Sequence, residues 1–483
     1  MKFKKVLLVN SNYPNSFYTI PVWPLGLGYI AETLKQRGIE YKVIDLGFAD
    51  NLKNFHKNIS DFRPDLIGIS CMTSRYKHHY EKIRNIKKAF PDIPIVAGGP
   101  HISTLREKVL IDCPELDYGI SGEGEEAIIE LCEGAEHKDI KGLYYRNGKE
   151  GKYEGDRARI SELDNIPFPT YDGFEIEKYD TKSMNILSSR GCPYDCIYCS
   201  VKLAIGRKWK ARTAMNVVDE ITYWYELGYR FFNFNDDAFN VNTKRVYDIC
   251  DEIEKRNLKI ELNAPNGMRA DKADLALLKR MKETGFSHIA LGVESADNRV
   301  LENIKKGERI EEIEETIKNA CNLGFEVALF FLIGSPGEGE KEIEKSFKLA
   351  KKYPIVDVRF YNLVPFPNTE LFEWIDRNNY FVQLPEDYLN GNMQWLNEPI
   401  FFTPELSREA RKSTYKRGLK IGKKLRRQYT FNYYNKCLKK LGLFSKLFAF
   451  MASRDFVQFV LSKSNVLKKV RILFKKYEIF KRV

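Results

Sequence analysis

The chain has 483 residues, of which 43% are hydrophobic and 30% charged, as in a folded protein of two or three domains. Nine cysteines, three of them close together, fit a reducing, cytoplasmic compartment better than a secreted disulfide scaffold. No uninterrupted apolar run is long enough to cross a bilayer, and the run at 6–9 is too short for a signal peptide. The formal net charge of +12 is uneven, because residues 407–483 hold 23 of the 78 basic residues and 3 of the 66 acidic ones.

Residues 1–135 alternate short apolar runs with helical patterns. We expect strands at 5–9, 41–46, 65–70, 93–97 and 118–120, and helices at 24–37 and 76–90. This alternation predicts a doubly wound, Rossmann-like parallel sheet, whose ligands bind beyond the carboxyl ends of the strands. Small residues gather at those ends: Ser70, Thr73, Gly98, Gly99, Gly122 and Gly124. Each alone is explained by an ordinary turn, although glycine also lets a backbone approach a ligand closely.

Residues 136–183 are expected to connect two domains. The alternating segment 142–155, with Asn147-Gly148 inside it, predicts a hairpin. Ile166-Pro167-Phe168-Pro169 should be extended, because proline disfavours a helical residue before it. No chemistry stands out in this segment.

Three cysteines, Cys192, Cys196 and Cys199, follow an apolar run at the spacing C-x3-C-x2-C. Three thiolates on one loop can hold three irons of a cubane cluster, whereas most iron–sulfur clusters are closed by four cysteines. No fourth cysteine lies within 49 residues on either side, so the fourth iron would be open to a small molecule. Structural zinc, the main alternative, normally takes four protein ligands.

Residues 184–385 repeat strand and helix signals about six times. We expect strands at 184–189, 231–235, 258–263, 287–292, 326–333 and 355–362, with helices between them, for example at 215–227 and 271–284. Parallel strands with crossover helices can close into a partial (β/α)6 barrel, related to the TIM barrel, with its site at the carboxyl ends of the strands. Polar and glycine-rich segments follow most of these strands, and each alone could be a helix cap or a turn.

Residues 386–483 form a basic and mainly helical region. Basic helices with Phe and Leu faces can lie in a membrane interface, and basic clusters favour anionic lipid. A solvated helical cap packed on the barrel is the alternative. No nucleic-acid recognition module of the usual kinds is present, so no nucleic acid is expected as a partner.

The cysteine motif, with Tyr198 before its last cysteine, resembles the radical SAM family. The resemblance implies a [4Fe-4S] cluster on Cys192, Cys196 and Cys199, whose open iron binds S-adenosylmethionine (SAM). It also implies SAM contacts on the segments that follow the strands: Tyr198 near the adenine, Asp236 and Asp237 for the ammonium, Arg269 for the carboxylate, Glu294 and Ser295 for the ribose and methionine, and Ile333 and Gly334 beside the adenine. No residue is assigned a catalytic role of its own.

The first domain resembles the cobalamin-binding domain of cobalamin-dependent radical SAM enzymes. The matching pieces are Pro24-Leu25-Gly26-Leu27-Gly28-Tyr29, Gly98-Gly99-Pro100-His101 and Gly122-Glu123-Gly124-Glu125. The implied cobalamin contacts are Leu25, Gly26, Ser70, Thr73, Gly98, Gly99, His101, Gly122, Glu123 and Gly124. The signature D-x-H-x-x-G, whose histidine ligates cobalt in many cobalamin proteins, is absent. We therefore expect His101 to touch the corrin edge or nucleotide tail rather than the cobalt.

Together these resemblances imply an enzyme that cleaves SAM reductively to a 5′-deoxyadenosyl radical and methylates an unactivated carbon of a lipid or other secondary-metabolite-type substrate. A cyclase or rearrangement enzyme without methyl transfer, and a non-catalytic cobalamin- or redox-responsive binding protein, are the alternatives. A tRNA methylthiotransferase is disfavoured, because Cys71, Cys113 and Cys132 are dispersed rather than clustered. We expect an electron donor such as a flavodoxin or ferredoxin, and a cytoplasmic protein that the basic tail can bring to the inner face of the membrane.

Overall fold

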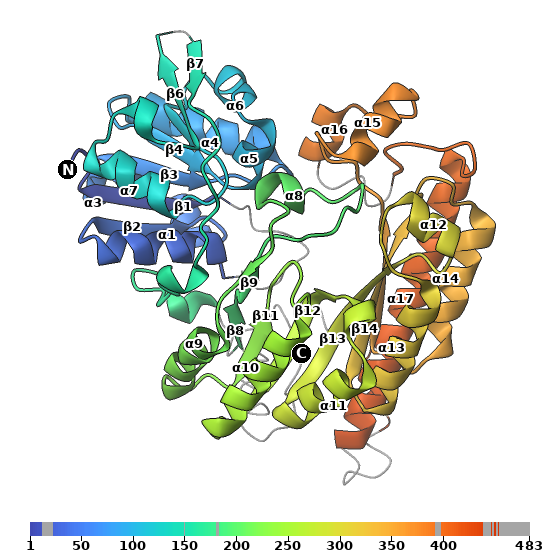
Figure 1. The fold of residues 1–483 in the computed structure, drawn as a ribbon. Helices are drawn as coiled ribbons and strands as arrows, with labels where there is room; N and C mark the ends of the chain where they lie inside the picture. Colours follow the sequence, from blue (N-terminus) through green and yellow to red (C-terminus); the bar gives the residue numbers. More distant parts are fainter. Residues whose placement is uncertain are drawn as a thin grey trace.

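A computed structural model describes residues 1–11, 23–148, 150–179, 183–391 and 398–437, together with residues 446, 449, 450 and 453. The chain forms two α/β lobes that lie side by side, and a long helix runs down the far flank of the second lobe (Figure 1). The α/β class and the order of the two lobes agree with the sequence-based prediction. Much of the expected amphipathic tail, including 441–445 and 454–483, lies outside the described residues.

The first lobe is a seven-stranded sheet of order β2-β1-β3-β4-β5-β6-β7. Its strands are β1 (Lys5–Asn10), β2 (Glu40–Asp45), β3 (Leu66–Ser70), β4 (Ile95–Gly98), β5 (Tyr118–Ile120), β6 (Leu143–Asn147) and β7 (Glu150–Tyr153). The first five are parallel, as predicted, and β6 and β7 join antiparallel. The expected hairpin at 142–155 thus extends this sheet, because it pairs with the otherwise open edge of β5.

Helices cover both faces of this sheet, and each face has its own apolar core. One core contains residues of α1 (Leu25–Gln36) and α7 (Glu125–Glu133), and the other contains residues of α3 (Phe55–Phe62), α4 (Tyr76–Ala89), α5 (Pro100–Leu105) and α6 (Lys108–Asp112). The short helix α2 (Ala49–Lys53) lies between β2 and α3. Two covered faces are the hallmark of a doubly wound sheet, so this part of the predicted fold is confirmed.

The second lobe is a six-stranded, all-parallel sheet of order β15-β14-β13-β12-β11-β8. Its strands are β8 (Ser183–Ile186), β11 (Phe231–Phe234), β12 (Glu261–Met268), β13 (Phe286–Glu294), β14 (Glu326–Ile333) and β15 (Asp357–Asn362). The crossover helices are α9 (Ala214–Glu226), α10 (Thr243–Lys255), α11 (Leu275–Thr284), α12 (Asn298–Asn303), α13 (Ile310–Asn322) and α14 (Glu340–Lys352). The helices lie on one side of the curved sheet (Figure 1), which is the partial barrel that the sequence predicts.

Two strands of this lobe differ most from their predicted bounds. The run at 184–189 is interrupted: β8 ends at Ile186, and β9 (Ser189–Arg190) then pairs antiparallel with β10 (Lys210–Ala211). The cysteine segment is therefore a loop closed at its base, with the small helix α8 (Val201–Ala204) inside it. The third strand runs from Glu261 to Met268 rather than from 258 to 263. Before it, Asn257 has a φ of 53°, in the left-handed region that ends a helix.

The carboxyl-terminal region adds α15 (Glu370–Arg377), α16 (Pro385–Asn390) and the 30-residue helix α17 (Arg408–Cys437). Helix α17 packs against the edge strand β15 through two glycines. A β-carbon on Gly422 would lie 2.6 Å from the carbonyl oxygen of Val358, and one on Gly418 would lie 2.8 Å from Phe360. Among the described residues, no helix has the length and apolarity needed to cross a bilayer.

The substitution Gly422→Val is expected to destabilise the barrel by about 1–3 kcal/mol, because the added methyl groups meet backbone atoms that cannot rotate away. The exposed Ser413→Val on the same helix is the control, since it introduces the same β-branched side chain without a clash. Denaturant unfolding of both variants measures the difference. Equal stabilities would show that α17 is not packed on β15 as described.

Candidate functional site between the two sheets

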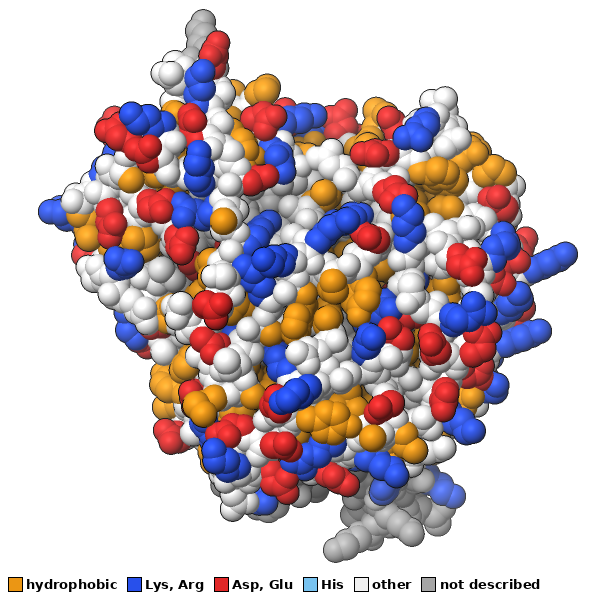
Figure 2. Space-filling view, viewed as in Figure 1, with side chains coloured by type: hydrophobic (Ala, Val, Ile, Leu, Met, Phe, Trp, Pro, Cys, Tyr) orange, Lys and Arg blue, Asp and Glu red, His pale blue; other side chains and the backbone are white. Residues whose placement is uncertain are grey.

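The carboxyl ends of both parallel sheets contribute to one cavity of about 360 Å³. The first lobe supplies α1 and the ends of β3, β4 and β5, and the second supplies the loops after β8 and β11. Its walls include Leu25, Gly26, Ser70, Gly98, Gly99, Gly122, Glu123, Gly124, Glu125, Leu187, Ser189, Arg190, Asn235 and Asp237. On the surface, hydrophobic side chains gather in the hollow between the lobes, with Lys and Arg beside them (Figure 2).

Eight of the ten residues expected to contact cobalamin line this cavity. A β-carbon on Gly26 would meet no atom within 4 Å, so this glycine leaves open space beside α1. Gly99 has a φ of 101°, and a β-carbon there would lie 2.8 Å from the carbonyl oxygen of Cys71. Gly26 thus leaves room in the cavity wall, whereas Gly99 is required by its own turn, since its φ and its approach to Cys71 both favour glycine.

Thr73 and His101 do not line the cavity. His101 is fully buried on the other side of its loop, where Nε2 forms a 2.8 Å hydrogen bond with the Tyr80 hydroxyl. Its ring also stacks on Tyr76 at 4.9 Å. Burial lowers the pKa of His101 to about 3. Pro100 begins α5, and the next residue therefore packs toward the core rather than toward the cavity.

The cysteine loop is held at several backbone positions. Cys192 N–H donates to the Gly206 carbonyl at 3.3 Å, and Ile197 N–H donates to the Ile304 carbonyl at 3.1 Å. Gly191 has a φ of 83°, and a β-carbon there would lie 2.6 Å from the Lys208 carbonyl oxygen. The three thiols are partly exposed, as ligands that must reach a group outside the protein core need to be.

Within the described ranges, no three Cys, His, Asp or Glu side chains are arranged to hold a single metal ion. In a cubane each cysteine binds a different iron, whereas zinc ligands meet at one point, and the three partly exposed thiols of one loop provide a ligand set of the first kind. Burial raises the pKa of all three thiols, and Lys306 opposes that effect at Cys196. A bound cluster would keep the thiols deprotonated. The residues present therefore fit a three-cysteine cluster.

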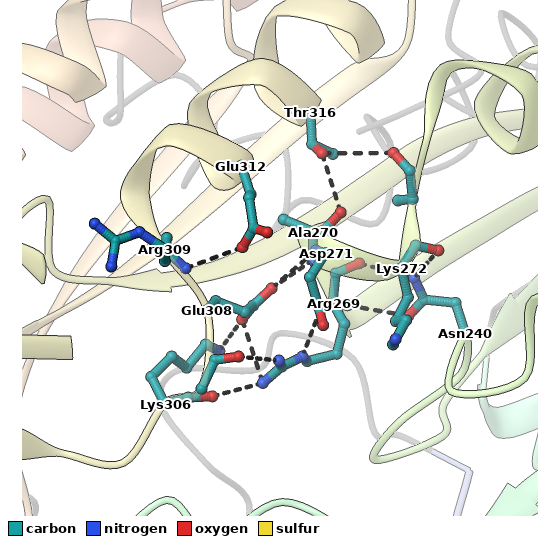
Figure 3. A network of polar contacts seen from close by, with 12 residues as sticks. Asn240, Arg269, Ala270, Asp271, Lys272, Lys306, Glu308, Arg309, Glu312 and Thr316 are labelled. Atoms are coloured by element: carbon teal, nitrogen blue, oxygen red, sulfur yellow. Dashed lines mark hydrogen bonds and ion pairs between the residues drawn. The ribbon is translucent and has the colours of Figure 1, made fainter. Parts of the chain in front are cut away.

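Arg269 lies beside this loop, in the network of Figure 3. Its guanidinium donates to Asp271 at 2.8 Å and to the carbonyls of Lys306 and Gly307 at 2.6 and 2.7 Å. It also lies 3.8 Å from the ring centroid of Tyr194 in the cysteine loop. Arg269 was expected to meet the SAM carboxylate. In the structure three of its donors fix the 306–308 segment against the cysteine loop, and its contact with SAM stays a prediction.

The two adjacent aspartates after β11 have different surroundings. Asp236 is buried and accepts hydrogen bonds from Ser188 N–H, Ser188 Oγ and Ser189 Oγ at 2.5 to 2.8 Å. Asp237 lines the cavity, and burial together with the charge of Asp236 raises its pKa to about 6. Of the two, Asp237 is the carboxylate that lines the cavity, and the contact of either with SAM stays a prediction.

Glu294 and Ser295 end β13 and connect to residues that the sequence did not single out. Glu294 has a φ of 62°, and its carboxylate lies 3.3 Å from Nζ of the buried Lys306. Burial disfavours the charged form of Lys306, but Glu294 and Glu308 outweigh it and raise its pKa. The ammonium therefore stays charged beside the cysteine loop.

Ser295 Oγ lies 3.3 Å from the buried carboxylate of Glu338, which also accepts from Gly334 N–H at 2.8 Å. Ile333 is buried at the end of β14, and a β-carbon on Gly334 would collide with the guanidinium of Arg411 from α17. Tyr198, partly buried, packs against the barrel core. The second-lobe residues predicted to bind SAM thus lie at neighbouring strand ends, and their roles stay predictions.

Residues 186–350 match the family model of the radical SAM superfamily, and residues 20–132 match that of the B12 binding domain. An uncharacterized methyltransferase of Pyrococcus horikoshii is 33% identical over 371 residues, which are 75% of this chain and 80% of that protein. The chain belongs to the radical SAM superfamily. It carries a B12-binding domain and is a cobalamin-dependent radical SAM enzyme, with a [4Fe-4S] cluster, SAM and cobalamin as cofactors.

Two further similar proteins are a sequence relative and a protein of known structure. An anaerobic magnesium-protoporphyrin IX monomethyl ester cyclase of Rubrivivax gelatinosus is 26% identical over 397 residues, covering 76% of this chain and 69% of that one. The structure of the cobalamin-dependent SAM radical enzyme OxsB, with aqua-cobalamin and SAM bound, superposes with a TM-score of 0.74 at 17% identity. The superposition covers 97% of this chain and 75% of OxsB. At 17% identity, this similarity shows the shared fold alone.

Sequence reasoning gave no role of their own to Lys306, Glu308, Glu338 and Arg411, which lie against residues predicted to bind SAM. Glu338 does follow the glycine-rich end of β14, which was singled out, but its own role was not. Lys306 and Arg411 lie in predicted helical or loop segments where lysine and arginine are ordinarily solvated. Only their burial, at 7% and 0% exposure, distinguishes them.

Burial raises the pKa of Glu338 to about 7, against 4.5 for an ordinary glutamate. A carboxyl whose pKa is higher in the folded state stabilises the fold fully below pH 4.5, and that stabilisation is lost as the pH rises through 7. Between pH 5 and 8 the loss is about 2–3 kcal/mol. In iron-free Glu338→Gln, the free energy of unfolding measured with denaturant should fall between pH 5 and 8 by about 2–3 kcal/mol less than in the iron-free wild type. A variant with the wild-type pH dependence would contradict this assignment.

Proposed function

We propose that this enzyme transfers a methyl group from SAM, by way of cobalamin, to an unactivated carbon of a small molecule of the lipid or secondary-metabolite type. The observation that carries the proposal is the single cavity lined by both lobes, which brings the expected cobalamin contacts next to Asp237 and the cysteine loop. The methyltransferase relative of Pyrococcus horikoshii supports the same reaction class.

The chain's own residues bind, orient and shield the reactants. When bound, the cluster supplies the electron that cleaves SAM to a 5′-deoxyadenosyl radical, and cobalamin carries the methyl group. Asp237 is positioned to receive the SAM ammonium, since a carboxylate of pKa about 6 is largely ionised near pH 7. Lys306 and Glu294 form a buried ion pair beside Cys196. Arg269 keeps its proposed role at the SAM carboxylate, because its hydrogen bonds use three of its five N–H donors.

A cyclase or rearrangement reaction without methyl transfer is the second candidate. The similarity to the cyclase of Rubrivivax gelatinosus favours it, because that relative shares both lobes. The two candidates predict different fates for the SAM methyl group: methyl transfer places it in the product, whereas a cyclase leaves it out. A non-catalytic cobalamin- or redox-responsive protein would form no product at all.

Labelled SAM separates these reactions. With SAM carrying a CD₃ methyl group and a panel of lipid and small-molecule substrates, methyl transfer should yield a product that retains deuterium by mass spectrometry. Reduced flavodoxin or ferredoxin should support turnover, because the proposed reaction needs an external electron donor. A product without deuterium, formed together with 5′-deoxyadenosine, would instead favour the cyclase.

Asp237→Asn should weaken SAM binding more than Asp236→Asn weakens it, measured by equilibrium dialysis.

We also propose that the basic carboxyl-terminal region brings the enzyme to anionic membrane surfaces. A cavity of about 470 Å³ at α17 is lined by Lys420, Lys423, Lys424, Arg427, Gln428, Phe431, Phe450 and Ser453. Four cations beside two aromatic rings suit an interface where phosphate headgroups meet acyl chains. A lipid substrate would then be encountered at the surface where it is dissolved.

Co-sedimentation with vesicles tests this proposal. The protein should bind vesicles containing phosphatidylglycerol and not vesicles of phosphatidylcholine alone, and binding should fall with salt because the attraction is electrostatic. Charge reversal at Lys420 and Lys424 should weaken binding at least several-fold, about 1 kcal/mol for each cation. Reversal of Lys244 and Lys259, exposed lysines in or near α10, is the matched control. Equal binding to neutral vesicles would contradict the proposal.

A further inference from the structure

One arginine connects the two cofactor-binding lobes directly. Arg190 of β9 lies two residues before Cys192, and its guanidinium donates to Glu123 at 3.0 Å and to Glu125 at 2.7 Å. In the first lobe, Glu123 lies in the loop after β5, and Glu125 is the first residue of α7. Arg190 also lies 4.8 Å from the ring centroid of Tyr29 on α1. The cysteine loop is therefore tied to two of the segments that wall the cavity.

This contact is buried rather than a surface ion pair. The side chains of Arg190, Glu123 and Glu125 are 12%, 9% and 8% exposed. Surface pairs contribute little and are easily exchanged for water, whereas a buried charge that loses its partner is strongly unfavourable. Arg190 cannot move away from the glutamates without leaving two carboxylates unneutralised in the cavity wall, so the pairing fixes the position of both loops.

Both ends of the contact are rigid. Beyond Arg190, the backbone of Gly191 lies close to the Lys208 carbonyl, and Cys192 N–H is bonded to Gly206. On the other side, Gly122 N–H is held by Ser103 Oγ at 2.9 Å, and the second oxygen of Glu123 accepts from Ile160 N–H at 2.9 Å. A displacement of the loop after β5 would therefore also displace the cysteine loop, because Arg190 joins two segments that are each held in place.

We propose that Arg190 is a positioning residue that couples the two cofactor sites. Filling the cobalamin cavity orders the segment that carries Glu123 and Glu125, and through Arg190 favours the arrangement of the cysteine loop that holds the cluster. The coupling is reciprocal, because a site that stabilises one arrangement of a shared contact strengthens binding at the other. It does not depend on whether the enzyme methylates or cyclises its substrate.

The test compares cobalamin affinity in the full-length protein with and without its iron–sulfur cluster. Hydroxocobalamin is titrated under anaerobic conditions into iron-free and reconstituted protein, and binding is followed by visible absorbance. In the wild type, the cluster should tighten cobalamin binding by about 5-fold or more, the lower end of typical coupling between sites. In Arg190→Gln the ratio of the two affinities should fall to near 1, with both cofactors still bound. No substrate and no turnover are needed.

An arginine in the barrel whose carboxylate partners are exposed serves as a control. Arg280 also bridges two carboxylates, those of Asp251 at 2.7 Å and Glu254 at 2.5 Å, but it connects α11 to α10 and is not part of the cavity wall. Arg280→Gln should keep the wild-type ratio. Should Arg190→Gln fail to fold, Glu123→Gln serves in its place, because Arg190 retains Glu125. In Glu123→Gln, the ratio of cobalamin affinities with and without the cluster should lie between the wild-type ratio and 1, even if cobalamin affinity itself changes in both forms.

Three results would overturn the inference. The wild type could bind cobalamin equally well with and without the cluster. Arg190→Gln, or Glu123→Gln in its place, could keep the wild-type ratio. Arg190→Gln could also abolish cobalamin binding in both forms, which would make Arg190 a direct contact of the ligand. A change in the ratio that Arg280→Gln shares would equally count against a specific role of Arg190.

Discussion

The organisation of this protein depends on one constraint: the carboxyl ends of two parallel sheets must face the same space. Each sheet alone offers its ligand site at that edge, and neither contains both sets of residues. An aromatic contact at the base of the interface helps to hold the lobes together. Trp23, just before α1, stacks on Tyr179 at 4.5 Å, and its indole N–H donates to the Ser183 carbonyl at 3.2 Å. Tyr179 in turn donates to Asp45 of β2 at 2.8 Å.

Buried charge is concentrated where the cysteine loop meets the barrel. Arg269, Lys306 and Glu308 lie in one network whose cations are satisfied by carbonyl and carboxylate oxygens. Removing charged groups from water is costly unless they are paired, so the network is weak support for stability by itself. Its value is geometric: Arg269 contacts Tyr194, and Ile304 accepts from Ile197. The 304–308 segment is thereby fixed against the loop that carries the thiols.

The sequence could predict the features that repeat or that occupy strand ends. The alternation of apolar runs and helical patterns predicted the five parallel strands of the first sheet and the six of the barrel, and β14 has the predicted bounds. Five of the six small residues at strand ends did converge on one cavity, and Thr73 did not. What the sequence could not predict is the direction of an individual side chain. Asp236 and Asp237 are adjacent and chemically identical, yet Asp236 bonds to Ser188 and Ser189 while Asp237 lines the cavity.

The same limit explains why the carboxyl-terminal helix was underestimated. Its basic composition pointed toward solvent or membrane, and most of its lysines are exposed. Arg411, however, is fully buried and donates to the Leu363 carbonyl at 3.0 Å. Burial lowers the pKa of Arg411 to about 9, and the charge of Glu338 opposes that shift. Glu338 holds Gly334 and Ser295, so α17 supports two strand ends expected to bind SAM. The helix is therefore part of the barrel as well as its most basic surface, because one of its cations faces inward while the others face out.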